Sequence, residues 1–222
     1  MKISMIVPVY RGADKLLKLL KHLSHQNIDD FEVILVIDTN KERILSVVDE
    51  YKKNMKNLKI VFNTKRVGRS LALKQGIKMA TGEYLVLANT SVILNKTSME
   101  KLNSMADKFN GTDIIEFKSS FKFPIKVKGK IRKRFAKPVK IEDKPEVIAY
   151  TNPFSVFRLI RRVALEPTLT AHSLAPLNSI FSINSTYISL INAETYVNVP
   201  TSPFTINSKL RNNFNPPKMI RQ

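Results

Sequence analysis

Five strand-like runs joined by four helix-like segments fill the first half of the chain, and this alternation restricts the fold more than any other feature. The β-rich apolar runs occupy residues 3–9, 31–37, 58–62, 83–88 and 112–117. Between them, apolar side chains recur at helical spacing over residues 16–23, 44–51, 70–80 and 99–109. Because strand and helix alternate with short connections, the sequence predicts an α/β fold with a doubly wound, mostly parallel sheet.

The pattern changes after Phe117. The stretch from residue 118 to residue 140 contains Pro124, Gly129 and Pro138 and has no sustained period, which predicts a loop or weak hairpin. We predict helices over 154–165 and 177–191 and a strand over 196–199. The Pro- and Asn-containing end predicts a loose tail. The chain is therefore expected to form one domain, with an α/β half (1–117), an irregular basic half (118–200) and a tail (201–222).

Positive charge is the main departure from an ordinary composition. The 222 residues include 37 Lys and Arg against 18 Asp and Glu, a formal net charge of +19. Ten of the basic residues, and no acidic one, lie between Lys118 and Lys140. This charge indicates an anionic partner, which is nucleic acid, an acidic lipid surface or a phosphorylated substrate. Since no known nucleic-acid module accompanies the charge, an anionic membrane surface or a merely solvated loop is favoured over nucleic acid.

Several classes of protein are excluded or disfavoured by what the sequence lacks. The absence of Cys excludes a disulfide framework, a thiolate metal site and a cysteine nucleophile. No apolar run reaches the roughly 18–20 residues that span a bilayer, and Pro8 interrupts the short N-terminal run. We therefore expect a cytoplasmic protein, placed at the inner face of the membrane if the basic segment binds there.

Ligand sites of doubly wound sheets lie outside the carboxyl ends of the strands. Four segments of this chain follow such ends, at residues 8–12, 38–40, 63–69 and 89–92. These segments are the places where we expect functional side chains.

Three motifs in order resemble those of family 2 glycosyltransferases, which have the GT-A nucleotide-sugar fold. Residues 4–10, SMIVPVY, resemble the family's first strand, "SIIIPVYN". Residues 31–38, FEVILVID, resemble its "EVIIVDDGS" strand. Residues 68–77 followed by 80–84 resemble "GxSxARNxGIxxAxGEY". Their order and spacing make the combination far more specific than any single match.

The resemblance implies that residues 1–117 bind a nucleoside-diphosphate sugar, usually linked to UDP, and that residues 118–200 face the acceptor. An acceptor hydroxyl would attack the anomeric carbon with inversion. Asp38 matches the second Asp of the family's pair, where it would bind the nucleoside; the alternative is a cap on the next helix. Arg66 and Arg69 would bind diphosphate, or are solvated loop residues. The nucleotide-binding set carried over is Pro8, Tyr10, Asp38, Arg66, Arg69, Asn89 and Ser91.

Carboxylates are missing at two further positions that the resemblance marks. The family's Asp-x-Asp motif, which holds Mn²⁺ or Mg²⁺ against the diphosphate, falls on Asn89 and Ser91. The position of the catalytic base falls near Asn178 and Ser179, again without an acid. We therefore assign no metal or other cofactor and no catalytic residue. Glu142 and Asp143 are a weak alternative base and are better explained as a polar loop that offsets the basic run. The three histidines have no spacing partner.

Three functions follow from these observations. The first is a glycosyltransferase that moves a sugar from a nucleotide donor to a lipid or glycan acceptor. The second is a catalytically inactive homologue that binds a nucleotide, a glycan or a partner. The third is a binder of nucleic acid or of an anionic surface, in which the positive charge is itself the function.

Overall fold

The computed structural model describes residues 1–118, 135–147, 151, 158–165 and 193–206. Its first half alternates strands with helices: β1 (Ile3–Val9), α1 (Ala13–Leu23), β2 (Phe31–Ile37), α2 (Glu42–Asn54), β3 (Leu58–Phe62), α3 (Arg69–Met79) and β4 (Tyr84–Leu87). The chain continues through β5 (Val92–Ile93), α4 (Ser98–Lys108), β6 (Ile114–Phe117), β7 (Val139–Lys140), β8 (Arg158–Arg161), β9 (Thr195–Val199) and β10 (Thr205–Ile206).

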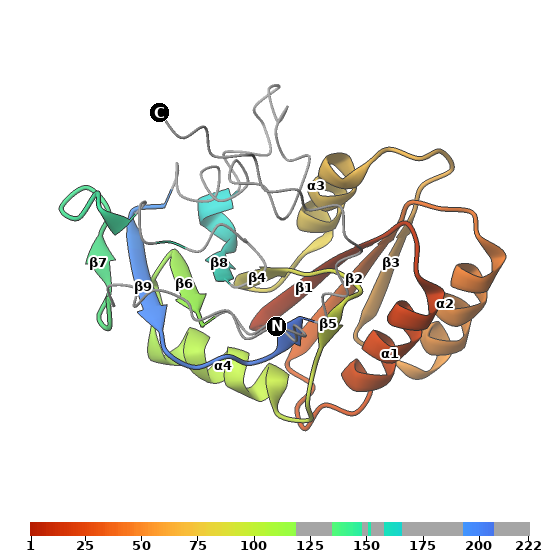
Figure 1. Cartoon of the computed structure of the whole chain (residues 1–222), viewed down its shortest axis with the longest axis horizontal. Helices are drawn as coiled ribbons and strands as arrows, with labels where there is room; N and C mark the ends of the chain where they lie inside the picture. Colours follow the sequence, from red (N-terminus) through yellow and green to blue (C-terminus); the bar gives the residue numbers. More distant parts are fainter. Residues whose placement is uncertain (119–134, 148–150, 152–157, 166–192, 207–222) are drawn as a thin grey trace, which may run out of the picture.

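One mixed sheet forms the centre of the molecule, in the order β3-β2-β1-β4-β8-β6-β9-β7. The strands β1 to β4, β6 and β9 run parallel, whereas β8 and β7 are antiparallel to their neighbours. Helices α1, α2 and α4 cover one face and α3 the other (Figure 1). The predicted mostly parallel, doubly wound sheet is confirmed.

The two central strands explain why this sheet forms. All seven residues of β1 and all seven of β2 are buried, as expected for strands covered by helices on both faces. Pairing of β1 with β4 ends at Ile6 and Leu87. Two residues later Pro8 lacks the N–H that would continue the ladder on that side. The chain that follows β4 is therefore free to turn away from β1.

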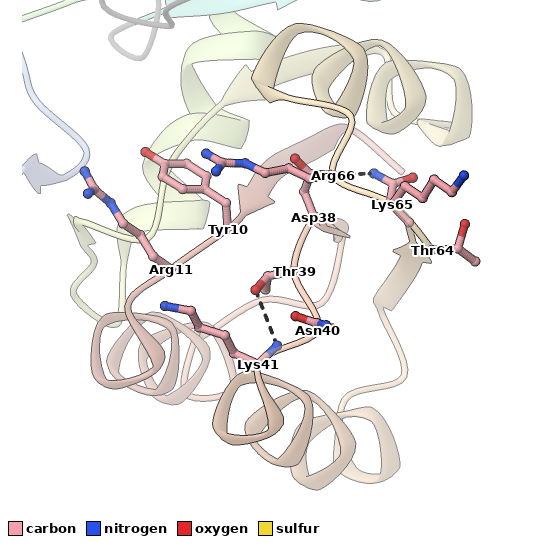
Figure 2. A pocket seen from close by; sticks show the side chains of 10 residues that line it. Tyr10, Arg11, Asp38, Thr39, Asn40, Lys41, Thr64, Lys65 and Arg66 are labelled. Atoms are coloured by element: carbon pink, nitrogen blue, oxygen red, sulfur yellow. Dashed lines mark hydrogen bonds between the residues drawn. The ribbon is translucent and has the colours of Figure 1, made fainter.

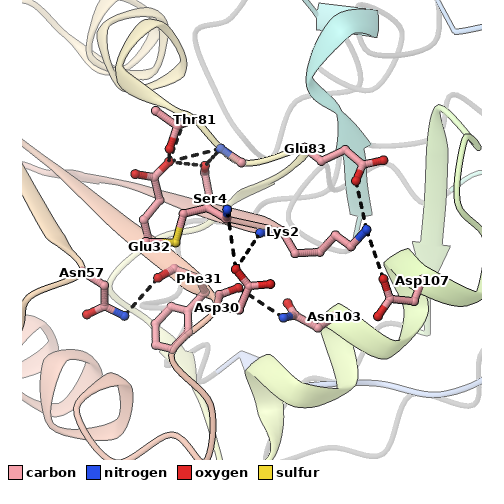
Figure 3. A network of polar contacts seen from close by, with 12 residues as sticks. Lys2, Ser4, Asp30, Phe31, Glu32, Asn57, Thr81, Glu83, Asn103 and Asp107 are labelled. Carbon is pink, nitrogen blue, oxygen red and sulfur yellow. Dashed lines mark hydrogen bonds and ion pairs between the residues drawn. The ribbon is translucent and has the colours of Figure 1, made fainter.

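Polar contacts tie together the amino ends of the same strands (Figure 3). The Lys2 ammonium lies 3.0 Å from Glu83 and 3.1 Å from Asp107 of α4. Glu32 is fully buried and accepts bonds from the hydroxyls of Ser4 (2.6 Å) and Thr81 (2.9 Å). Burial raises the pKa of Glu32, but bonds from Lys59, Ser4 and Thr81 outweigh it and lower the pKa to about 2. The amino ends of these strands are thus cross-linked, and their carboxyl ends are left for ligands.

The segment predicted as a helix over 154–165 contains a strand instead. Residues 158–161 form β8, which pairs with β4 and β6, and a short helical turn follows only at 162–165. Leu159 and Ile160 are fully buried, and so is Arg158, whose Nε lies 3.2 Å from Glu116 of β6. The predicted helix placed Arg158 on its polar, outward side, whereas this arginine points into the protein.

The C-terminal expectations have mixed outcomes. The strand predicted at 196–199 is present as β9. The first residues of the tail are not loose: Phe204 is buried against Phe117, with ring centres 5.3 Å apart, and β10 pairs with β5. Most of the basic segment, the helix predicted over 177–191 and residues 207–222 lie outside the described residues. No described helix is long and apolar enough to cross a membrane.

Candidate functional site

A cavity of about 460 Å³ opens where β1, β2 and β3 end, side by side in the sheet. Each strand supplies the residues that follow its last position, so three predicted ligand-binding segments meet there. The lining residues are Tyr10, Arg11, Asp38, Thr39, Asn40, Lys41, Asn63, Thr64, Lys65 and Arg66. The fourth predicted segment, 89–92, follows the neighbouring strand β4.

Cations dominate this lining (Figure 2). Four of the ten lining residues are basic, from all three connections, and Asp38 is the one acid among them. The side chain of Arg66 extends toward Tyr10, whereas Lys65 extends away from it (Figure 2). Cations in a concave site attract anions more strongly than the same charges spread over an open surface. The cavity is therefore suited to a polyanionic ligand such as a diphosphate.

Asp38 organises the rim of the cavity. Its carboxylate is almost fully buried and accepts hydrogen bonds from the backbone N–H groups of Val67 (2.7 Å) and Gly68 (2.9 Å). The Asn63 amide also donates to it, at 3.4 Å. Gly68 precedes the first residue of α3, so Asp38 fixes the approach to α3. The alternative prediction, a cap on the next helix, is wrong, because α2 begins after Lys41 with no side-chain cap.

Close packing holds α3 where this contact requires it. A Cβ added at Gly76 would lie 2.4 Å from a methyl carbon of Ile6 in β1 and 3.2 Å from one of Val36 in β2. Only glycine lets the helix approach the sheet this closely. Gln75, on the same turn, donates to the Asn63 side chain at 2.8 Å. The loop that carries Arg66 is thus braced from both of its ends.

Tyr10 lies between two arginines. The guanidinium carbons of Arg11 and Arg69 are each 5.4 Å from the centre of its ring, and Arg69 donates to its hydroxyl at 2.5 Å. Contacts of this kind between a cation and an aromatic face restrict both partners. Tyr10 therefore connects the end of β1 to the beginning of α3 across the cavity rim.

The degenerate Asp-x-Asp positions do not provide the donor set of a divalent metal. The Asn89 side-chain oxygen accepts the N–H of Ser91 at 2.7 Å, and the Ser91 hydroxyl accepts from the Lys15 ammonium at 3.2 Å. A hard cation such as Mn²⁺ needs anionic oxygen ligands. Here the positively charged Lys15 ammonium already contacts the Ser91 hydroxyl. Within the described ranges, no three His, Asp or Glu side chains are placed to hold a metal ion. The residues present do not fit the metal that the family resemblance implies.

The structure gathers some of the predicted site residues and not others. Tyr10, Asp38 and Arg66 line the cavity, while Arg69 contacts it through Tyr10. Pro8 is buried in β1, and Asn89 and Ser91 lie beyond β4, outside the lining. Asn178, Ser179 and His172 lie outside the described residues.

The alternative candidates for a catalytic base, Glu142, His22 and His25, lie far from this cavity. Glu142 is exposed beside Lys140 of β7, the strand at the opposite end of the sheet order. His22 lies in the last turn of α1 and His25 follows the end of this helix, whereas the cavity lies near its N-terminal end. Neither group can reach a ligand in the cavity.

Sequence reasoning missed three basic lining residues, Arg11, Lys41 and Lys65. Arg11 and Lys65 fall within the expected segments 8–12 and 63–69, and Lys41 follows the segment 38–40, but no motif marks any of the three. A solvated side chain is the ordinary expectation for a basic residue in such a connection. Each lies in the connection that follows one of the parallel strands β1, β2 and β3, and only the strand order reveals that the three connections are neighbours. Lys15 was missed because its partner, Ser91, is 76 positions away in the sequence.

Comparison with known families gives one match that covers most of the chain. The model of glycosyl transferase family 2 matches residues 4–167. Among characterised relatives, poly(ribitol-phosphate) beta-N-acetylglucosaminyltransferase TarS of Staphylococcus aureus is 27% identical over 168 residues, 71% of this chain and 28% of TarS. Poly(ribitol-phosphate) beta-glucosyltransferase of Bacillus spizizenii is 29% identical over 117 residues, 51% of this chain and 18% of that protein. The chain therefore spans less than a third of either relative.

Solved structures share the fold. The crystal structure of S. aureus TarS 1-349 in complex with UDP-GlcNAc has a TM-score of 0.74 and 20% identity, covering 94% of this chain and 59% of that one. Mannosyltransferase PcManGT from Pyrobaculum calidifontis, in complex with GDP-Man and Mn²⁺, has a TM-score of 0.63 and 17% identity, covering 96% of this chain and 58% of that one. At these identities the likeness establishes the GT-A fold alone.

Proposed function

The chain belongs to glycosyl transferase family 2, and on that premise we propose that it binds a UDP-linked sugar in the cavity at the ends of β1, β2 and β3. We further propose that it transfers the sugar, with inversion at the anomeric carbon, to a hydroxyl of a glycan or lipid acceptor. Sequence relatives that transfer glucosyl and N-acetylglucosaminyl groups support the reaction class. A structural relative bound to UDP-GlcNAc supports the donor class.

The cationic lining of the cavity carries this proposal. Transfer breaks the bond between the anomeric carbon and the diphosphate oxygen, and the electron pair of that bond stays on the oxygen. The departing UDP therefore gains negative charge as the acceptor oxygen bonds to the anomeric carbon and releases its hydroxyl proton to the solvent. Arg11, Lys41 and Arg66 surround the space in which this charge would develop. Fixed cations stabilise such a charge in the transition state more than in the ground state.

Asp38 and the backbone around it account for recognition of the nucleoside. Its carboxylate lies in the cavity lining and is held by backbone N–H groups, so its orientation is fixed before a ligand arrives. A carboxylate can accept about four hydrogen bonds, and the described residues supply three donors to Asp38. One acceptor position thus remains for the uracil N–H or a ribose hydroxyl.

Charge and relatives together favour a phosphate-containing polymer as the acceptor. The net charge is +19, and both relatives compared above act on poly(ribitol-phosphate). A basic protein concentrates such a polyanion at its surface, and this attraction weakens as salt is added. An acidic membrane surface would be attracted by the same charge, so the acceptor assay includes both.

The experiment is a transfer assay with UDP-glucose, UDP-GlcNAc and UDP-galactose, each offered with poly(ribitol-phosphate), with anionic vesicles or with buffer alone. We expect UDP release that depends on the polymer and on one of the three donors, and a product of inverted anomeric configuration by NMR. Binding of UDP without turnover on any acceptor would instead indicate the catalytically inactive homologue. Absence of UDP binding would contradict the proposal as a whole.

A further inference from the structure

Lys15 reaches from the first turn of α1 to the loop that follows β4. Its ammonium donates to the Ser91 hydroxyl at 3.2 Å. We propose that the Lys15 ammonium binds the diphosphate of the nucleotide and supplies there the positive charge that a divalent metal supplies elsewhere in the family. This inference rests on the proposed function, since it concerns the same nucleotide.

The local bonding leaves no place for a metal beside Ser91. Asn89 uses its side-chain oxygen to accept the Ser91 N–H, which closes a turn of the Asx type. The Ser91 hydroxyl oxygen faces an ammonium group. A divalent ion at this point would meet neutral oxygens and the full repulsion of a charged lysine. The loop that lacks the two carboxylates thus has the Lys15 ammonium in contact with its Ser91.

Lys15 retains the capacity to bind a phosphate. An ammonium group has three N–H donors, and one of them points to Ser91. The side chain is exposed and begins at the same end of α1 as the cavity residue Arg11. Gly12, between them, has a φ of 87°, a left-handed conformation that turns the chain from β1 into α1. Arg11 thus lines the cavity, while Lys15 reaches the loop after β4, the strand beside β1 in the sheet.

Two basic side chains can offset the charge that develops on the diphosphate, without a metal ion. When the donor bond breaks, the electron pair moves to the diphosphate, and the adjacent Lys15 and Arg11 offset the added negative charge. A lysine interacts with phosphate as a compact point charge and an arginine with a planar pair of donors. Their attraction to UDP is electrostatic, so the affinity should fall with added salt but not with a chelator.

Calorimetric titration of UDP into the whole chain tests this inference. We expect the dissociation constant to be the same, within about twofold, in EDTA and in Mn²⁺. Lys15→Ala should weaken binding by about tenfold or more, because a charge-assisted bond is lost. Lys15→Arg should restore most of the affinity. Lys21→Ala is the matched control: it removes the same charge from the same helix, about 9 Å further along its axis, and should leave the affinity unchanged.

A second experiment restores the carboxylates of the metal motif and uses Mn²⁺ itself as the probe. The triple variant Lys15→Ala, Asn89→Asp, Ser91→Asp restores two carboxylates and removes the competing cation. It should bind UDP more tightly in Mn²⁺ than in EDTA, a difference that we do not expect for the natural chain.

Two results would overturn the inference. UDP binding by the natural chain that requires Mn²⁺ would contradict it and leave the proposed nucleotide site intact. Equal affinities of the Lys15→Ala and Lys21→Ala variants would do the same. A chain that binds UDP in neither buffer would contradict the proposed function as well, so the two failures can be told apart.

Discussion

Asp38 shows how a single side chain can serve both the fold and the site. The family resemblance suggested a nucleoside contact, and in the structure the carboxylate also holds the backbone of Val67 and Gly68 thirty residues away. Residue type alone can indicate a carboxylate at a strand end but cannot identify its partners. The three partners come from another loop, which only the completed sheet brings near.

Asp38→Asn tests this double role. The amide has one oxygen in place of two, so a part-buried N–H of Val67 or Gly68 loses its acceptor, at a cost of about 1 kcal/mol or more. We expect a loss of that size in the free energy of unfolding by urea, together with weaker UDP binding. Asp29→Asn is the matched control, since this carboxylate is exposed in the connection between α1 and β2. Equal stability of the two variants would contradict the anchoring role of Asp38.

At the level of elements, the strands and helices of the first half could be predicted because their burial repeats along the sequence. β1 and β2 are buried throughout, and α1 buries Leu16, Leu19, Leu20 and Leu23 on one side. β8 could not be predicted in the same way. Its inward side chains include Arg158, a residue type that pattern analysis places on the surface.

The ion pair of β8 with β6 gives a prediction at this scale. The Arg158 side chain is fully buried and that of Glu116 is 2% exposed. Arg158→Met therefore removes the cation that faces the buried Glu116 carboxylate. We expect a loss of about 3–5 kcal/mol in the free energy of unfolding by urea. The control is Arg161→Met on the same strand, whose side chain is 38% exposed and lies 3.6 Å from Asp113. There the loss should stay below about 1 kcal/mol.

A double variant distinguishes the effect of an unpaired buried charge on stability from the effect of changed packing. Replacing Arg158 by Met and Glu116 by Leu together removes both charges and should recover much of the lost stability. If the double variant is as unstable as the sum of the two single ones, the pair is not the cause and β8 is held by its backbone pairing alone.

At the level of the whole molecule, topology decides what the sequence could reveal of the site. The alternation of strands and helices predicted the sheet, and the rule for its carboxyl ends predicted three of the segments that form the cavity. The charge of the cavity could not be predicted, because Arg11, Lys41 and Lys65 come from three connections that are neighbours only in space. The same holds for Lys15 and Ser91. The net charge of +19 first pointed to the basic segment, but four of the 37 basic residues line the cavity against a single acid.

The central claim, that a nucleotide binds at the carboxyl ends of β1, β2 and β3, is tested most directly by hydrogen exchange of the whole chain with and without UDP. We predict slower amide exchange in peptides that cover residues 8–12, 38–41 and 63–69, and no change in peptides from α4. Protection confined to α4 or β6, or no protection at saturating UDP, would contradict the claim.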